Sequence, residues 1–536
     1  DSTTQILISI YQDLLNWSLI HKFKTLSIAI VIFIVSIWMV PLLGTEFVPK
    51  ADFSETTLNF NTPAGSSLEL TEARAREVET IVREFPEVRY TLTKINTGNA
   101  NGKIYASIYI RLVDRDKRQR DITEMSSVLR ERLRSVAGIT VTHIGLLDAV
   151  GANKQIVFSI QGPDTSELQR LSTLALEKIK YIPGLVDLDS SMKPNKPSLS
   201  LKIDREKASD LGLSVAMISD NLRTLVAGQT VSNWRAANDQ TYDVNVRLSP
   251  QDRQKPQDLN RIPFLVGKNT DGTPRIVRLN QVAELSRSTS PNQINRRDLM
   301  REVSISGNVA FRSGGEVSAD ITKVMSSIVM PNGYSFKFSG STKDMAESFG
   351  YAINALIMAI LFIYMILASQ FKSFLQPLAL MTSLPLTLIG VVLALLTFNS
   401  TLSMFSIIGV ILLMGLVTKN AILLVDFATR SREDSINEDG TINPGLNRHD
   451  ALLLAAKVRL RPILMTTLAM IFGMIPLAFA LSEGSEMRAP MGQAVIGGVV
   501  TSSLLTLVVV PVVYCYLDDF GNWIRKIFGF TRQPKR

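Results

Sequence analysis

One lysine lies deep inside an apolar stretch near the C-terminal end of the chain. It is the strongest candidate for a chemical role. Lys419 stands in GLVTKNAILLVDF, about 17 residues into a run from Leu402 to Phe427 that is long enough to cross a membrane. A lysine at that depth costs about 3 kcal/mol or more, so it normally faces a bundle interior, pairs with another group and marks an ion path. The alternative is a structural lysine satisfied by carbonyl groups. We expect Lys419 to face inward and to take part in ion movement.

The remaining polar residues of the apolar stretches are weaker candidates. They are Thr418, Asn420, Thr466 and Thr467. A lone hydroxyl in a helix usually donates to a carbonyl one turn earlier, so it indicates little by itself. Asp426 lies two turns after Lys419 and nearer the end of the span, which favours an interfacial acid over a proton carrier. Pro462 is expected in the first turn of its helix, where its missing N–H does no harm.

Several kinds of chemistry find no support in the sequence. It contains no phosphate-binding G-x-x-x-x-G-K-[ST] loop, no G-x-S-x-G and no H-E-x-x-H. One cysteine, Cys515, and three widely separated histidines offer neither a disulfide framework nor a metal cluster. We expect no enzymatic activity, no cofactor and no metal, with any driving force supplied by an ion gradient or a partner. The net charge of +9 could indicate nucleic acid, but the basic residues gather beside apolar stretches, which favours a membrane and no nucleic acid.

Six apolar stretches are long enough to span a membrane as helices. They are Thr25–Gly44, Ser348–Ala368, Phe374–Phe398, Leu402–Phe427, Pro462–Leu481 and Met491–Leu517. Lysine and arginine concentrate before the first stretch, in two of the links and after the last stretch, which predicts cytoplasmic chain ends. The region of about 300 residues between the first two stretches then lies on the opposite face. That face is the periplasm in a bacterium with two membranes.

This long region alternates strand-like and helix-like periods, which predicts an α+β fold. Its first part reads as strand, helix, strand, strand, helix, strand, the order of a split βαβ or ferredoxin-like unit. The ranges are Phe53–Asn61, Ser67–Glu84, Val88–Ile95, Ile104–Val113, Ile122–Val136 and Thr140–Ile144. The turn-rich TGNANG (97–102) joins the two middle strands.

A second unit of the same kind is predicted in two pieces. Its ranges are Gln155–Gln161, Thr165–Tyr181 and Val186–Ser190, followed later by Arg301–Ser306, Gly315–Met330 and Tyr334–Ser339. The insert between the pieces contains a helical pair (Asp204–Ala227) and a hairpin whose polar turn is NTDGTP (Asn269–Pro274). The predicted fold is therefore an α-helical membrane bundle of six helices plus a large α+β region with ferredoxin-like subdomains.

The predicted domain plan follows these elements. It has a cytoplasmic amphipathic segment (1–24), a first span (25–44), a first βαββαβ subdomain (45–150), a split second subdomain (151–196 and 300–345), an inserted subdomain (197–299), five spans (346–519) and a basic cytoplasmic tail (520–536). The chain starts with Asp1 rather than Met, which indicates a processed chain or a fragment.

Three motifs resemble a known family. GLVTKNAILLVDFA, VRLRPILMTTLAMIFGMIPLA and ILASQFKSFLQPLALMTSLPL are similar to the C-terminal half of resistance-nodulation-division (RND) exporters. The similar branch is the hydrophobe/amphiphile one, which pumps drugs out of Gram-negative bacteria by proton antiport. The order of one span, a large loop and five spans also matches, so the resemblance covers nearly the whole chain. It implies a multi-pass protein of the bacterial inner membrane that exports drugs, detergents and dyes.

The resemblance also implies site residues and partners. By motif match, Lys419, Asn420 and Thr466 would belong to a proton relay, and Arg459 would contribute from the cytoplasmic side. The carboxylate pair of that relay would lie in an N-terminal half outside this chain. Substrate contacts would fall at Tyr109 and Leu92, although TGNANGK is shorter than the family's switch loop and lacks its phenylalanines.

The remaining implied partners are a periplasmic adaptor (membrane fusion) protein, an outer-membrane channel, small hydrophobic substrates and further copies in a homotrimer or heterotrimer. The two βαββαβ subdomains would be porter subdomains, and residues 197–299 would dock to the channel.

Two alternatives stay open. The same architecture serves exporters of metal ions or lipids, but export of soft Cu(I) favours a methionine cluster. The methionines of the long region are scattered, at Met125, Met192, Met217, Met300, Met325 and Met330. The second alternative is a membrane-anchored scaffold or receptor without transport, which would not need Lys419.

Overall fold

The structure is a computed structural model of the 536-residue chain. It describes residues 2–96, 102–145, 154–193, 195–290, 293–433, 435–436, 442–443 and 445–527. The predicted TGNANG turn lies almost wholly outside these residues, as does the end of the basic tail. The chain divides into two compact units. The larger unit contains Asp1–Thr62, Ser67–Ser191 and Asn295–Arg536, and the smaller contains Pro63–Ser66 and Met192–Ile294.

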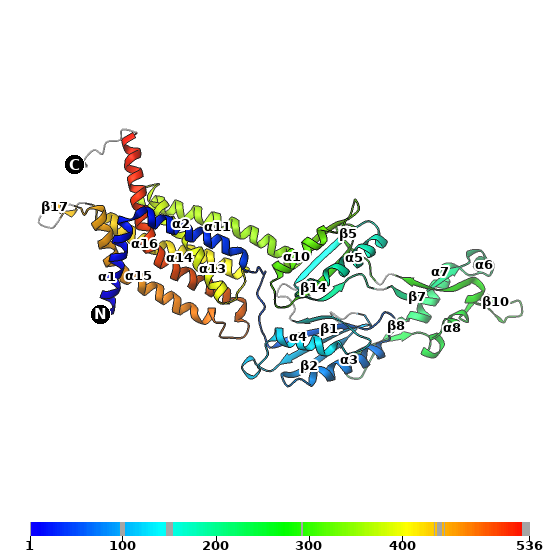
Figure 1. Cartoon of the computed structure of the whole chain (residues 1–536). Helices are drawn as coiled ribbons and strands as arrows, with labels where there is room; N and C mark the ends of the chain where they lie inside the picture. The colour runs from blue at the N-terminus through cyan, green and yellow to red at the C-terminus, as the bar shows by residue number, and fades with distance from the viewer. Residues whose placement is uncertain are drawn as a thin grey trace. The chain divides into compact units, whose positions relative to one another are not determined.

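Six helices in the described part of the chain are long and apolar enough to span a membrane, which confirms the six predicted spans. They are α2 (Lys22–Met39, continued by a 3-10 turn Val40–Leu42), α11 (Ser341–Phe371), α12 with α13 (Gln376–Met381 and Ser383–Thr397), α14 (Met404–Arg430), α15 (Arg448–Ala478) and α16 (Ala489–Ile527). A further helix, α1 (Ser2–Ile20), packs through Tyr11 and Leu15 against α15 and α16. Figure 1 shows these helices gathered in one bundle.

The predicted start of α15 is wrong. This helix begins at Arg448, where the Oδ1 atom of Asn447 accepts a hydrogen bond from the Arg448 N–H at 3.1 Å. Pro462 therefore lies inside the helix and not in its first turn. The buried residues before the proline recur at helical spacing and are Ala451, Leu452, Ala455, Ala456 and Leu460. Their packing in the bundle extends the helix toward the N-terminus despite the proline.

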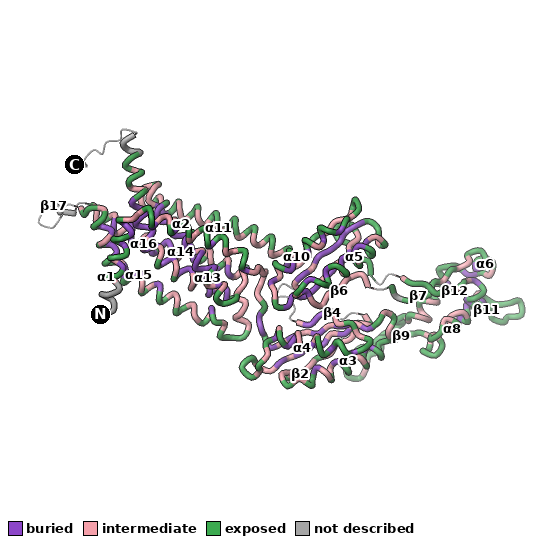
Figure 2. Tube along the Cα trace, viewed as in Figure 1, coloured by how far each residue is buried: buried purple, intermediate pink, exposed green. Residues whose placement is uncertain are grey.

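The centre of the bundle is formed by α13 and α16. In each of these spans 61% of the most apolar stretch is buried, against 6% for α11, which therefore lies at the edge. The two central helices cross closely at Gly390 and Gly497, because a Cβ atom added at Gly390 would lie 2.2 Å from the carbonyl oxygen of Gly497. Small residues permit such close approaches between membrane helices. Figure 2 shows that buried residues concentrate along these central helices.

The first lobe, as we call residues 52–145, has the predicted order of elements. It contains β1 (Glu55–Asn61), α3 (Leu68–Arg83), β2 (Val88–Ile95), β3 (Tyr105–Leu112), α4 (Ile122–Leu133) and β4 (Thr140–Gly145). The strands form an antiparallel sheet in the order β2-β3-β1-β4. Leu58 and Ile108 point to the face that α3 and α4 cover, and both are fully buried. The side chains of Ser67 and Asp121 cap α3 and α4, because each accepts one or more hydrogen bonds from backbone N–H groups in the first turn of its helix.

The second lobe repeats this arrangement from two pieces of chain. It contains β5 (Ile156–Gly162), α5 (Thr165–Ile179), β6 (Leu185–Ser190), β13 (Asn295–Arg297), β14 (Met300–Val309), α10 (Gly314–Ser326) and β15 (Ser335–Ser339). The order β6-β14-β5-β15 matches that of the first lobe, and β13 pairs with the other end of β14. The pieces meet because β14 pairs with β5 along seven residues.

The smaller unit interrupts the second lobe. Its elements are β7 (Lys196–Ile203), α6 (Arg205–Asp210), α7 (Val215–Leu222) with a π-helical turn (Arg223–Ala227), β8 (Gln229–Arg235), β9 (Thr241–Val246), α8 (Pro256–Asn260), β10 (Pro263–Lys268), β11 (Pro274–Arg278), α9 (Leu279–Val282) and β12 (Ala283–Ser290). The predicted helical pair and the predicted hairpin at Asn269–Pro274 are both present. Its core is formed around Ile218 and Phe264.

Candidate functional site

Lys419 lies on the exposed side of α14. The exposed residues of this helix up to that point recur at helical spacing, and they are Met404, Ile408, Leu412, Gly415 and Lys419. The opposite side, with Leu413, Val417 and Leu424, packs against α13, α15 and α16. Among the described residues Lys419 has no hydrogen-bond or ion-pair partner. Apolar residues occupy the inward side of α14 in this chain, so the described residues do not supply the inward-facing partner expected for Lys419, and its role stays a prediction.

Asn420 and Thr466, the other two residues expected near the centre of the relay, lie in different surroundings. Asn420 is 3% exposed, and its Nδ2 atom lies 3.5 Å from the hydroxyl of Ser503 on α16. Its Oδ1 atom is buried without a hydrogen-bond partner in the described part of the chain. Thr466 is half-buried on α15 and donates to the carbonyl of Ile463 at 3.0 Å, which is the expected bond to the preceding turn.

Arg459 lies near the C-terminal end of α14. Its guanidinium carbon stands 5.0 Å from the ring centroid of Phe427, and its Nε atom is buried without a hydrogen-bond partner among the described residues. Asp426 pairs with Arg430 at 3.1 Å in the last turn of α14, which fits an interfacial acid. No hydrogen bond or ion pair between described residues joins Lys419 to Thr466 or Arg459, so their shared role stays a prediction.

A cavity of about 330 Å³ lies between the two lobes. It is lined by apolar and polar side chains, among them Phe53, Tyr109, Ile144, Val309 and Met487. Tyr109 is one of the two residues expected to contact substrate. Its hydroxyl donates to Glu55 at 2.6 Å, and this hydrogen bond raises the pKa of Tyr109 to about 12. The phenol therefore stays neutral and can present its ring to a ligand.

Leu92 lies beside Tyr109 but outside the cavity wall. The two residues are opposite each other in the register of β2 and β3, and Leu92 is 51% exposed. Tyr90 on the same strand has its ring centroid 6.4 Å from that of Tyr109. Sequence analysis missed Tyr90, although its even spacing from Leu92 in a strand puts both on one face.

A buried polar network joins the two lobes beside the cavity, and its residues Arg130 and Asn308 line the cavity wall. Asp187 on β6 receives two hydrogen bonds of 2.8 Å from Arg130 on α4 and one of 2.7 Å from Asn308 on β14. Asn308 also lies 2.9 Å from the Nδ1 atom of His143 on β4. Burial lowers the pKa of His143 from 6.5 to about 4, so its imidazole is neutral. None of these residues formed a motif, because they lie on elements far apart in sequence.

Six helices in the described part of the chain are long and apolar enough to span a membrane, and one of them carries a lysine near its middle. A large folded region lies outside the bundle. These features define a multi-span membrane protein. The sequence pattern of the AcrB/AcrD/AcrF family matches residues 1–518, and the chain belongs to this RND family of transporters. The resemblance seen in the motifs is thereby confirmed.

Individual relatives agree with this assignment. The chain is 29% identical over 527 residues to the swarming motility protein SwrC of Bacillus subtilis, and the match covers 96% of this chain and 47% of SwrC. It is 28% identical to the multidrug resistance protein MdtC of Klebsiella pneumoniae, with 95% and 48% covered. The chain thus spans about half the length of these relatives.

Among solved structures, a crystal structure of a heavy metal efflux pump superposes with a TM-score of 0.83 at 23% identity. The match covers 97% of this chain and 53% of that one. At this identity the similarity establishes the fold alone.

Proposed function

We propose that this chain is the C-terminal half of a proton-driven RND pump that exports hydrophobic and amphiphilic compounds across the cell envelope. The bundle would lie in the bacterial inner membrane, and the ferredoxin-like lobes would be periplasmic porter subdomains. Residues 197–299 would dock to an outer-membrane channel, with an adaptor protein around a trimeric assembly. One observation carries the proposal, namely the exposed position of Lys419 in the middle of a spanning helix.

The exposed face of α14 argues for a partner within the membrane. An ammonium group facing lipid at that depth costs about 3 kcal/mol or more, so another polypeptide with an acidic group is the stable neighbour for Lys419. Gly415 lies one turn before Lys419 on this face, and a Cβ atom added there would meet nothing within 4 Å. A small residue at this point permits a close approach by a helix of the other half.

A carboxylate pair on that helix supplies a mechanism. Ionised carboxylates attract Lys419, and their protonation removes the attraction, so the helices repack with each proton that enters and leaves. Asn420, Thr466 and Arg459 lie on the two helices that would move, and Asn420 also approaches α16. The movement would alternate the access of the cavity between the lobes.

The cavity favours organic substrates over metal ions. Its volume of about 330 Å³ falls at the lower end of the range for small-molecule sites, and aromatic and aliphatic side chains form much of its wall. In the described part of that wall Met487 is the only thioether, and no thiol is present. Soft metals prefer several sulfur ligands. MdtC is named for multidrug resistance, which agrees with this choice, whereas the heavy metal pump shares the fold.

Export by the full-length protein tests the proposal. We would reconstitute it in vesicles with an imposed proton gradient and follow a fluorescent hydrophobic dye. Lys419→Ala should abolish uphill export at matched amounts of protein, and Lys419→Arg should be impaired because a planar guanidinium does not replace a compact ammonium. Thr466→Ala should be milder, since one neutral hydrogen bond contributes about 1 kcal/mol. The matched control is Asp426→Asn, which removes only an exposed pair with Arg430 and should be near neutral.

Two results would overturn the proposal. Unchanged export by Lys419→Ala would remove Lys419 from proton coupling and would favour a scaffold or an unrelated energy source. Export of Cu(I) without export of dye would instead assign the cavity to metal ions.

A further inference from the structure

The loop that connects α15 to α16 (residues 479–488) contacts the first lobe. We propose that this α15–α16 loop is a rigid coupling element that positions one wall of the cavity, so that movement of these two helices directly reshapes the substrate site. The transport part of this inference rests on the proposed function. The positional part rests on the contacts alone.

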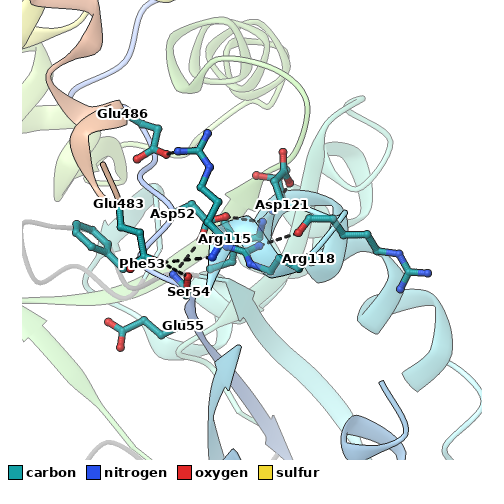
Figure 3. A network of polar contacts seen from close by, with 12 residues as sticks. Asp52, Phe53, Ser54, Glu55, Arg115, Arg118, Asp121, Glu483 and Glu486 are labelled. Carbon is teal, nitrogen blue, oxygen red and sulfur yellow. Dashed lines mark hydrogen bonds and ion pairs between the residues drawn. The ribbon is translucent and has the colours of Figure 1, made fainter. Parts of the chain in front are cut away.

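Two glutamates of the loop hold the first lobe (Figure 3). The Oε1 atom of Glu483 accepts a hydrogen bond from the hydroxyl of Ser54 at 2.8 Å and lies 3.4 Å from the backbone nitrogen of Arg115. Glu486 forms an ion pair with the guanidinium of Arg115. The lobe therefore meets the loop at two separate points, just before β1 and in the 3-10 turn Arg115–Lys117 that precedes α4.

The part of the lobe that receives the loop is itself rigidly built. Asp52 accepts hydrogen bonds from the backbone N–H of Ser54 at 2.9 Å and of Ile122 at 3.2 Å, and it pairs with Arg118. The side chains of Asp52 and Arg118 are 9% and 1% exposed. This buried ion pair ties the start of β1 to the start of α4, so a displacement of Ser54 moves the body of the lobe and not a loose strand end.

Close packing between Gly484 and Phe53 adds an apolar contact between the loop and the first lobe. Gly484 adopts a φ of +76°, and a Cβ atom added there would lie 2.2 Å from the ring of Phe53. Phe53 and Met487 both line the cavity between the lobes, and Met487 stands two residues before the start of α16. A residue of the membrane domain therefore forms part of the substrate cavity, without a flexible linker between it and the helix.

The loop joins the helices that carry the predicted relay. α15 bears Thr466 and Arg459, and α16 approaches Asn420 through Ser503. A shift of either helix is transmitted to Met487 by the chain itself. It reaches Ser54 through Glu483 and Phe53 through Gly484. Helix movement and cavity shape are thus linked by side-chain contacts that the loop supplies.

Removing the two charges tests this link in the full-length protein. The double variant Glu483→Gln with Glu486→Gln keeps the size of both side chains but weakens their contacts with Ser54 and Arg115. The matched control is Glu72→Gln, because Glu72 pairs with an arginine on α3 in the same lobe and has no contact with the loop. The rate of dye export should fall roughly two- to thirty-fold in the double variant, the range for substitutions along coupled contacts, and should stay unchanged in the control.

A spin-label distance measures the positional part without any export. Cys515 is buried and is the only cysteine of the chain, so it is replaced by Ala. Labels are placed at Glu131→Cys on α4 and Phe472→Cys on α15, two exposed positions. The distance distribution should be narrow in the parent and in the Glu72→Gln control, and broad in the double glutamine variant.

Each outcome decides the inference. A narrow distribution in the double variant would show that the glutamates do not hold the lobe to the helices. A broad distribution with an unchanged export rate would show that a loose connection suffices. If Lys419→Ala exports as well as the parent, the proposed function fails, and the label distances still judge the coupling element separately.

Discussion

Acidification should loosen the contact between the two lobes, because His143 is buried there as a neutral imidazole. The Nε2 atom of His143 lies 3.1 Å from the carbonyl oxygen of Gly145, and Nδ1 lies 2.9 Å from the amide nitrogen of Asn308. This geometry assigns the proton to Nε2 and makes Nδ1 an acceptor. A second proton on Nδ1 would face the donating amide of Asn308, whose Nδ2 atom also donates to Asp187 at 2.7 Å.

The size of the effect follows from the pKa of His143, which burial lowers from 6.5 to about 4. Between pH 6.5 and pH 4, His143 binds more protons in the opened or unfolded state than in the folded state. The stability that neutral His143 contributes to the contact between the lobes is therefore fully present above pH 6.5 and is lost as the pH falls. From pH 7 to pH 5 the loss is about 2 kcal/mol, because about 1.5 pH units of that interval lie below 6.5 and each contributes about 1.4 kcal/mol.

The carboxylate of the same network does not cancel this loss. Burial by itself would raise the pKa of Asp187, but hydrogen bonds from Arg130, Asn308 and the Ile144 N–H hold it below its usual value of 3.8. Asp187 therefore stays ionised throughout the interval from pH 7 to pH 5.

Hydrogen exchange measured by mass spectrometry on the purified protein tests this prediction. Protection of peptides from β4, β6 and β14 should fall by about 2 kcal/mol from pH 7 to pH 5, after correction for the intrinsic exchange rate. His143→Asn keeps an acceptor but cannot be protonated in this range, so its protection should be lower at pH 7 and nearly independent of pH. His21→Asn, at a half-buried histidine outside the lobes, should retain the pH dependence. Equal pH dependence in the parent and in His143→Asn would refute the reasoning.

Three further substitutions have defined outcomes. Gly390→Ala should lower the melting temperature in detergent, because the added methyl group collides with α16, whereas Gly350→Ala on α11 meets nothing within 4 Å and should not; equal melting temperatures would contradict the close crossing. Tyr11→Phe removes a 2.8 Å hydrogen bond to the main chain of α16 and should cost about 1 kcal/mol of protection in α1, measured by hydrogen exchange. Arg118→Met leaves the buried Asp52 without its counter-charge and should cost roughly 3–5 kcal/mol, seen as faster exchange at 52–55 and 115–122; unchanged exchange there would argue against the buried pair.

The sequence by itself determined the spans and most elements of the lobes. A run of about 20 apolar residues has few stable solutions other than a membrane helix, because each unpaired backbone group in hydrocarbon costs several kcal/mol. Alternation in Glu55–Asn61 and Tyr105–Leu112, and the 3.6-residue period in Leu68–Arg83, are local signals that survive in the fold. Motif similarity likewise sufficed for the family.

Only the tertiary structure decided which way the deep lysine faces. The depth of Lys419 is a property of its position in the run, but its direction depends on which side of α14 finds neighbours. Leu413 and Val417 take the packed side, so Lys419 is left on the exposed side of this chain. The start of α15 at Arg448 was decided in the same way, because packing of the residues before Pro462 outweighed the local effect of proline.

The contacts between distant segments were also beyond sequence analysis. His143, Asp187 and Asn308 meet because β4 and the strands of the second lobe lie side by side, and Ser54 meets Glu483 across 429 positions of the chain. A local period carries no information about such pairings, since they form only when complete elements have been placed. The cavity and its coupling to the helices therefore belong to the tertiary structure, whereas the helices and strands that build them belong to the sequence.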